Sequence, residues 1–160
     1  MVGMSAEGSL RGARDALLRV RAARSKDGRW RRDHRRALGR YGQALALRYL
    51  LARDFKLLER NYRTRIGEID LIVFDEYVLV FVEIKTRLVE RSDGGGPVWK
   101  SPLEWLSASQ LARLRSVAEA WLADERYATP AVEKMRLDAI GVLIDAKGSL
   151  LDLRHVEGGE

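Results

Sequence analysis

Four charged residues at the ends of two neighbouring apolar segments could form a catalytic site. Glu68 and Asp70 stand at the start of the first segment, and Glu83 and Lys85 stand at the end of the second. Oxygen ligands without His or Cys suit a hard cation such as Mg²⁺ or Mn²⁺. Carboxylates that hold such an ion, beside a lysine that orients or activates water, could hydrolyse a phosphodiester bond.

The segments that must position these residues are Ile66–Phe74 and Tyr77–Ile84. Both are rich in β-branched and aromatic residues, which favours strands. Because only Asp75–Glu76 separates them, we expect an antiparallel hairpin with a two-residue turn, in which Phe74 faces Tyr77.

This register brings the carboxylates together. Glu68 faces Glu83, and Asp70 is the diagonal neighbour. The other face of the hairpin is wholly apolar and consists of Ile69, Leu71, Val73, Val78, Val80, Val82 and Ile84. The charges could instead be the solvent side of a half-exposed hairpin. However, the second strand is apolar on both faces before it ends in Glu83 and Lys85, which places these charges at the rim of a core.

The motifs G-E-I-D-L-I and F-V-E-I-K-T-R resemble the signature of the YraN family of endonuclease-like bacterial proteins. That family resembles the PD-(D/E)XK nuclease superfamily, which includes Holliday-junction-resolvase-like proteins. The resemblance runs from about Gly39 to Val142. It implies that Asp70 and Glu83 bind Mg²⁺ or Mn²⁺ and that Lys85 positions or activates the attacking water, with Glu68 in a supporting role.

A helix before the first strand contributes another candidate residue. Asp33 can cap a helix that runs to about Arg53. Within it, G-R-Y-G-Q is similar to the opening G-R-x-G-E of the family. Superfamily enzymes commonly place a metal-supporting glutamate at this point, and here Gln43 offers an amide oxygen without charge. Gly39 and Gly42 would allow close backbone approach, either to the sheet or to a phosphate.

A second helix is expected from Ser107 to about Ala123. The sequence S-A-S-Q matches a capping box, in which Gln110 bonds back to the Ser107 amide. Gln110 could instead reach the active site, as a helix residue after the E-x-K motif does in several nucleases of the superfamily. Between the two motifs, the glycine-rich segment Glu90–Ser101 is either a substrate-guiding loop or simply flexible.

Arginines lie close to the candidate site in the sequence. The candidates for nucleic-acid binding are Arg40, Arg63, Arg65 and Arg87. Cations beside an acidic metal site are what a phosphate-backbone substrate requires. Each arginine taken singly could also be an ordinary surface charge.

Composition limits the class of protein. A chain of 160 residues is long enough for one domain with a real core, and the absence of Cys excludes disulfides and thiolate sites. With two distant histidines, a histidine-based metal site is not expected. No apolar run is long enough to span a membrane and the start lacks a signal peptide, so we expect a cytoplasmic protein.

The net charge of +6 is unevenly distributed. Residues 1–40 contain 12 Lys and Arg against 4 Asp and Glu, which leaves the rest of the chain slightly acidic. We therefore divide the chain into a basic N-terminal extension, residues 1–32, partly helical or disordered, and an endonuclease-like domain, residues 33–160. The extension could contact nucleic acid or only keep the protein soluble.

Three further strands complete the predicted domain. They are Phe55–Tyr62, Met135–Ile144 and the edge strand Leu150–Val156. The fold class is α/β, a restriction-endonuclease-like domain with a mixed central sheet flanked by helices.

We therefore expect a metal-dependent endonuclease acting on nucleic acid, with DNA as the favoured partner and a homodimer as one arrangement. The alternatives are a non-catalytic nucleic-acid-binding module or an interaction subunit that keeps the nuclease fold.

Overall fold

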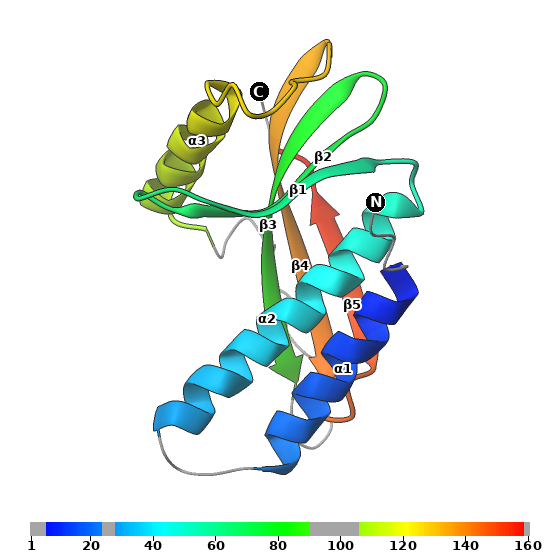
Figure 1. The fold of residues 1–160 in the computed structure, drawn as a ribbon. Coiled ribbons are helices and arrows are strands. Elements are labelled where there is room, and N and C mark those ends of the chain that lie inside the picture. Colours follow the sequence, from blue (N-terminus) through cyan, green and yellow to red (C-terminus); the bar gives the residue numbers. More distant parts are fainter. Residues whose placement is uncertain (1–5, 24–27, 90–105, 159–160) are drawn as a thin grey trace.

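The computed structural model describes residues 6–23, 28–89 and 106–158. Three helices and five strands follow in the order α1 (Ala6–Ala22), α2 (Gly28–Leu51), β1 (Lys56–Arg63), β2 (Glu68–Phe74), β3 (Val78–Val89), α3 (Ala108–Leu122), β4 (Lys134–Asp145) and β5 (Leu150–Val156). The strands form one sheet in the order β1-β2-β3-β4-β5, with β3 and β4 parallel and all other neighbours antiparallel. Figure 1 shows α1 and α2 side by side and α3 apart from them. The predicted α/β class with a mixed sheet and flanking helices is confirmed.

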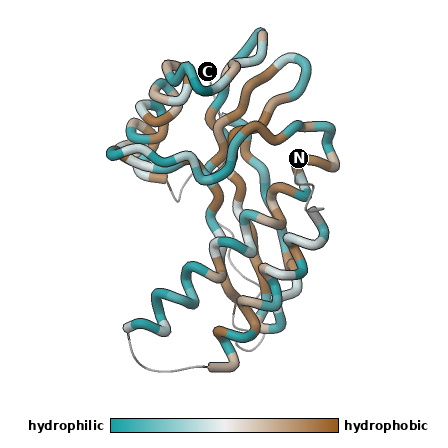
Figure 2. Tube along the Cα trace, viewed as in Figure 1, coloured by the Kyte–Doolittle hydropathy of each residue, from teal (hydrophilic) through white to brown (hydrophobic). Residues whose placement is uncertain are grey.

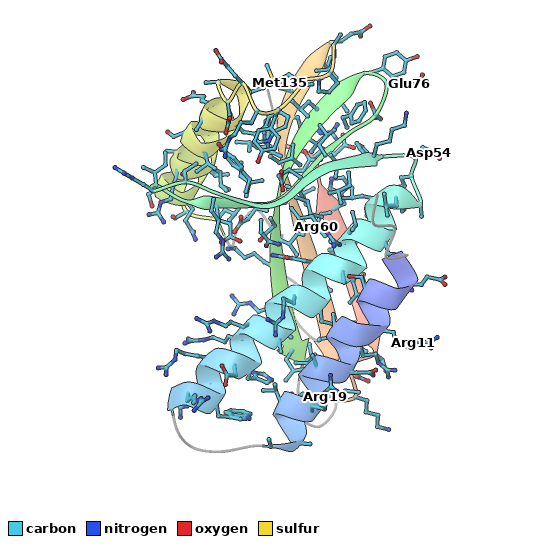
Figure 3. All side chains as sticks on the ribbon, in the orientation of Figure 1. Arg11, Arg19, Asp54, Arg60, Glu76 and Met135 are labelled. Carbon is cyan, nitrogen blue, oxygen red and sulfur yellow. The ribbon has the colours of Figure 1, made fainter. Side chains whose placement is uncertain are left out.

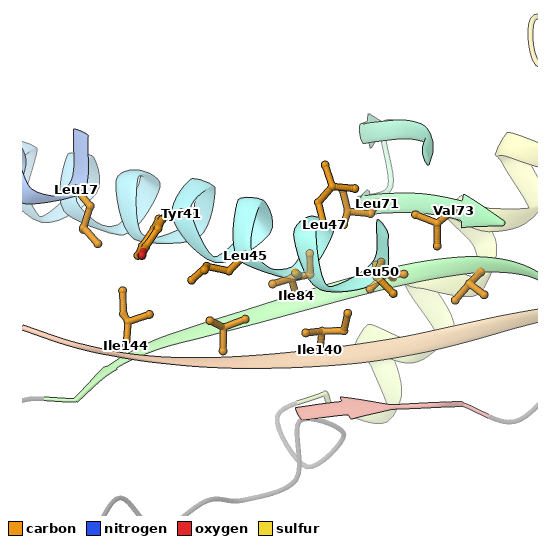
Figure 4. Close-up of a cluster of buried hydrophobic side chains, with 14 of the residues drawn as sticks. Leu17, Tyr41, Leu45, Leu47, Leu50, Leu71, Val73, Ile84, Ile140 and Ile144 are labelled. Carbon is orange, nitrogen blue, oxygen red and sulfur yellow. The ribbon is translucent and has the colours of Figure 1, made fainter. Parts of the chain in front are cut away.

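Two apolar clusters cover the two faces of the sheet. On one face, α1 and α2 pack against alternate residues of β2, β3 and β4, and Leu17 of α1 is fully buried there. Figure 4 shows Tyr41 and Leu45 of α2 above Ile84 and Ile144 of the sheet. On the other face, α3 packs its buried residues, Leu114, Val117, Ala118 and Trp121, against the opposite set of strand residues.

The hairpin between β2 and β3 forms, but its predicted register is wrong. Phe74 pairs with Leu79 rather than with Tyr77. The side chain of Asp75 is the cause, because its Oδ1 accepts the backbone N–H groups of Tyr77 and Val78, both at 2.8 Å, and so moves the turn one residue along the chain. This shift changes every cross-strand partner by two residues but leaves the faces unchanged.

Ile69 nevertheless lies on the face of the sheet opposite to the one predicted. Leu71 and Val73 lie on the α2 side as predicted, whereas Ile69 packs in the cluster on the α3 side. Regular pairing of β2 with β3 ends at Leu71 and Val82. The alternation of side chains along β2 is therefore interrupted at Asp70, between Ile69 and Leu71.

The long helix starts earlier than predicted. It begins at Gly28, so Asp33 lies inside α2 and does not cap it. Trp30 holds the additional turns in place, because its indole N–H donates to the backbone oxygen of Val20 in α1 at 2.7 Å and its ring stacks on His34. Within the predicted N-terminal extension, residues 6–23 thus form a helix and its last turn against α2.

Gly42 is required where α2 approaches the sheet. A Cβ atom added there would overlap with the Oγ1 of Thr86 on β3, whereas one at Gly39 would meet nothing within 4 Å. Of the two predicted roles for these glycines, close approach to the sheet is confirmed for Gly42.

Candidate active site

Asp70 lies where β2 separates from β3. Its Oδ2 accepts the backbone N–H of Ile84 at 2.7 Å, so the carboxylate takes the place of a strand partner at the edge of β3. Its Oδ1 accepts a hydrogen bond of 2.6 Å from Nε2 of Gln43. The carboxylate is therefore fixed by α2 and β3 together, and neither contact could be read from the spacing of residues in the sequence.

The environment of Asp70 makes its negative charge unfavourable. Burial is the largest effect, and the nearby charge of Glu83 adds to it, which raises the pKa of Asp70 to about 7. The hydrogen bonds from Ile84 and Gln43 act in the opposite direction, and the charge of Glu68 contributes a further small increase. At neutral pH this carboxyl is thus poised between its protonated and ionised forms.

Glu83 and Lys85 form an ion pair on β3. The Nζ of Lys85 lies 2.6 Å from Oε1 of Glu83, and both side chains are largely shielded from solvent. They are two residues apart on one strand and therefore point to the same side of it. The lysine thus compensates the charge of Glu83, while the charge of Asp70 has no basic partner among the described residues.

Glu68 has a different neighbour from the one predicted. Its Oε2 pairs with Nε of Arg63 at 3.0 Å, and the arginine side chain is 73% exposed. The charge of Glu83 raises the pKa of Asp70 more than the charge of Glu68 does, so Glu83 is the main acidic neighbour of Asp70. The acidic pair at the centre of the site is therefore Asp70 and Glu83.

The other candidate arginines are on the surface. Arg40 on α2, Arg65 in the turn before β2 and Arg87 on β3 are all exposed. Within the described residues, neither Arg40 nor Arg65 forms an ion pair.

Gln110 is engaged at the start of α3. Its backbone N–H donates to Oγ of Ser107 at 3.2 Å, and its Oε1 accepts the Ser107 N–H at 2.9 Å. The capping box is confirmed, and the side chain is not joined to the carboxylates within the described residues. Segment Glu90–Ser101 lies outside those residues.

A divalent cation at this site would have few protein ligands. Among the described residues, no group of three or more His, Asp or Glu side chains is arranged so that it could hold a metal ion. Mg²⁺ is often bound through one or two carboxylates and completes its shell with water and substrate phosphates. Asp70 and Glu83 fit that pattern, and rotation of the Gln43 amide would offer its oxygen as a third, uncharged ligand.

A second polar cluster lies away from this site. Asp138 of β4 is buried and accepts hydrogen bonds from Arg136 and from the backbone N–H of Gly158. Its Oδ2 lies 2.6 Å from Nε2 of His155. Burial alone would raise the pKa of Asp138, but the bonds from His155, Arg136 and Gly158 hold it below its usual value. This cluster joins β4 to β5 and the segment after it. Only the Arg-x-Asp spacing signalled it in the sequence.

This five-stranded mixed sheet with helices on both faces is an α/β fold consistent with a restriction-endonuclease-like domain. The chain belongs to the family described as Uncharacterised protein family UPF0102, whose profile matches residues 42–142. This is the YraN family that the two motifs indicated.

Several relatives match most of this chain. It is 41% identical over 115 residues to a UPF0102 protein of Streptomyces griseus, covering 72% of this chain and 89% of that protein. A UPF0102 protein of Nocardioides is 39% identical over 124 residues, covering 78% and 91%. One of Mycolicibacterium gilvum is 37% identical over 132 residues, covering 80% and 97%. Within the described residues, no helix is both long enough and apolar enough to cross a membrane.

Proposed function

We propose that this protein is a divalent-metal-dependent endonuclease that hydrolyses nucleic-acid phosphodiesters, with DNA as the favoured substrate. The observation that carries the proposal is the partly buried Asp70 carboxylate, held by Gln43 and Ile84 and close to Glu83. A carboxyl that is partly removed from water beside a second acid is costly for folding, and such arrangements concentrate at functional sites.

In this proposal Asp70 and Glu83 hold Mg²⁺ or Mn²⁺, and Gln43 supports Asp70. The bound ion would neutralise charge on the phosphate and lower the pKa of a bound water. Lys85 has three N–H donors, one of which is directed at Glu83, so the others can orient an attacking water. The exposed guanidinium groups of Arg40 and Arg65 can bind phosphate oxygens beside the site.

The test is titration with Mg²⁺ and Mn²⁺ by calorimetry, with DNA cleavage assayed on the same samples. We expect wild-type protein to bind the ions and cleave, and Asp70→Ala to do neither. Asp152→Ala is the matched control, because it removes one carboxylate from β5, where Asp152 pairs with exposed Arg154. A wild-type protein that neither binds metal nor cleaves, with DNA present, contradicts the proposal.

One observation favours a non-catalytic nucleic-acid-binding module instead. Gln43 presents its amide nitrogen, a donor that repels cations, to Asp70. The Gln43→Glu variant tests this alternative. If it binds metal and cleaves DNA while the wild type does neither, the wild-type site has the geometry of a nuclease but lacks one negative charge.

A further inference from the structure

The first half of α2 has a regular row of arginines. Arg29, Arg32, Arg36 and Arg40, here called the arginine row, are separated by three or four residues and therefore share one face of the helix. All four side chains are exposed. In Figure 3, a series of long side chains ending in nitrogen projects from this half of α2 on the side away from α1.

Within the part of the chain that the structure describes, no salt bridge compensates the charges of the arginine row. Asp33 is the only carboxylate in this half of α2, and it too forms no ion pair there. Like charges at this spacing repel each other and destabilise a helix slightly. A polyanion along the row would remove that repulsion.

The same helix face leads to the candidate site. Continuing at intervals of three and four residues, the face passes from Arg40 to Gln43 and then to Leu47 and Leu50. Gln43 binds Asp70, whereas both leucines are buried in the cluster that includes Leu71 and Val73 of β2. Figure 4 places Leu47 next to Leu71, and Figure 2 shows a largely hydrophilic first half of α2. The exposed row thus ends at Gln43, the residue of α2 that binds Asp70, where the helix begins to pack against β2.

We propose that the arginine row binds the phosphate backbone of a nucleic-acid strand and leads that strand to the Asp70 site. The inference rests on the proposed function for the role of the site, but the binding surface itself can be tested separately. At 1.5 Å per residue, the row is about 17 Å long, which equals the rise of about five base pairs along the axis of a duplex. The planar guanidinium group suits phosphate better than an ammonium group does.

The experiment measures binding of a short labelled DNA duplex in EDTA, where cleavage is prevented, over a range of salt concentrations. The variant is Arg32→Gln/Arg36→Gln. The matched control is Arg11→Gln/Arg19→Gln, which removes two exposed charges from α1, on the other side of the helix pair from the row (Figure 3). All proteins are first compared by circular dichroism and melting, and both variants are expected to remain folded because the substituted side chains are exposed.

Each phosphate contact adds about 0.9 to the slope of log affinity against log salt. We expect the row variant to lose about two such contacts, so that its affinity loss between about 50 and 200 mM salt is about tenfold smaller than that of the wild type. The control should retain the wild-type slope. Three results would each overturn the inference. The row variant could keep the wild-type salt slope, the control variant could lose as much slope as the row variant, or the wild type could fail to bind the duplex.

Two further arms separate this inference from the proposed function. Asp70→Ala should bind the duplex with the wild-type slope, whether or not the wild-type protein cleaves DNA. If binding depends on the row but no metal-dependent cleavage occurs, the inference stands and the nuclease proposal fails. If the row instead binds an acidic polypeptide such as polyglutamate more tightly than DNA, the assignment to nucleic acid is wrong.

Discussion

Asp70 is the residue in which folding and function conflict. Its carboxylate is partly buried at a strand end, near a second acid. Among the described residues, two hydrogen bonds but no cation offset its charge. A proton can relieve this unfavourable charge in the free protein. In the proposed enzyme a divalent cation would take the place of that proton, so metal binding and the ionisation of Asp70 should be linked.

The raised pKa predicts how stability changes with pH. The folded-state pKa of Asp70 is about 7, against an ordinary value of 3.8, so the folded state binds this proton more tightly than the unfolded state. The stability that the group contributes is complete below about pH 4 and is lost as the pH rises through about 7. Above that pH the folded protein carries the buried charge.

Asp70→Asn should therefore stabilise the metal-free protein at about pH 8 by as much as about 4 kcal/mol, with a gain that shrinks toward pH 4. Denaturant unfolding in EDTA across this pH range checks it. The asparagine can still accept from Ile84, and the Gln43 amide can rotate to restore its hydrogen bond. Asp152→Asn, on exposed β5, is the control. A gain that does not vary with pH would mean that folding does not raise the pKa of Asp70.

At the scale of elements, the close crossing of α2 over β3 positions Gln43 above Asp70. The contact between Gly42 and Thr86 sets this distance, because no side chain fits between the helix and the strand. Gln43 is then close enough to donate its hydrogen bond to Asp70, at the point where β2 separates from β3. The geometry of the site thus depends on a glycine that has no chemical role.

Substitution at two glycines of α2 should have opposite effects. Gly42→Ala should destabilise the protein by about 1–3 kcal/mol, because the new Cβ overlaps Thr86 and forces α2 away from β3. Gly39→Ala should stabilise it by up to about 1 kcal/mol, because alanine favours a helix and a Cβ there meets nothing. Thermal unfolding measures both changes. Equal effects at the two positions would show that α2 does not approach the sheet closely at Gly42.

At the scale of the whole molecule, α1 belongs to the same core as the sheet. Leu17 is fully buried in the cluster that α2 forms with β3 and β4, and Tyr41 of α2 donates to the Gly148 backbone oxygen at 2.7 Å between β4 and β5. Removing α1 would therefore uncover apolar surface. Charge substitutions on α1 and α2 are thus a better test of nucleic-acid contact than deletion of either helix.

Leu17→Ala should lower the free energy of unfolding by about 2–5 kcal/mol, the usual result of a cavity in a packed core. The comparison is Leu151→Ala on β5, where the side chain is 47% exposed and the loss should be small. Urea unfolding of both variants checks this. A small effect at Leu17 would mean that α1 packs loosely on α2 in solution.

Local patterns in the sequence were sufficient for the elements. Alternation predicted the strands, S-A-S-Q predicted the start of α3, and the G-E-I-D and V-E-I-K motifs indicated the family and the acidic residues at the strand ends. These signals depend on neighbours a few residues apart, so they can be read without knowing the fold. Two details differ from these patterns. At Asp75 a side chain to backbone contact outweighed the shortest connection, and α2 begins at Gly28 rather than after a cap at Asp33.

The geometry of the site was decided only by the tertiary structure. Three properties depend on residues far apart in the sequence. These are the hydrogen bond between Gln43 and Asp70, the position of Asp70 rather than Glu68 as the acidic partner of Glu83, and the raised pKa of Asp70. The continuity of the arginine row with that site depends on such residues too. Burial and long-range contact set these properties, because desolvation and charge coupling exist only once α2 lies against the sheet.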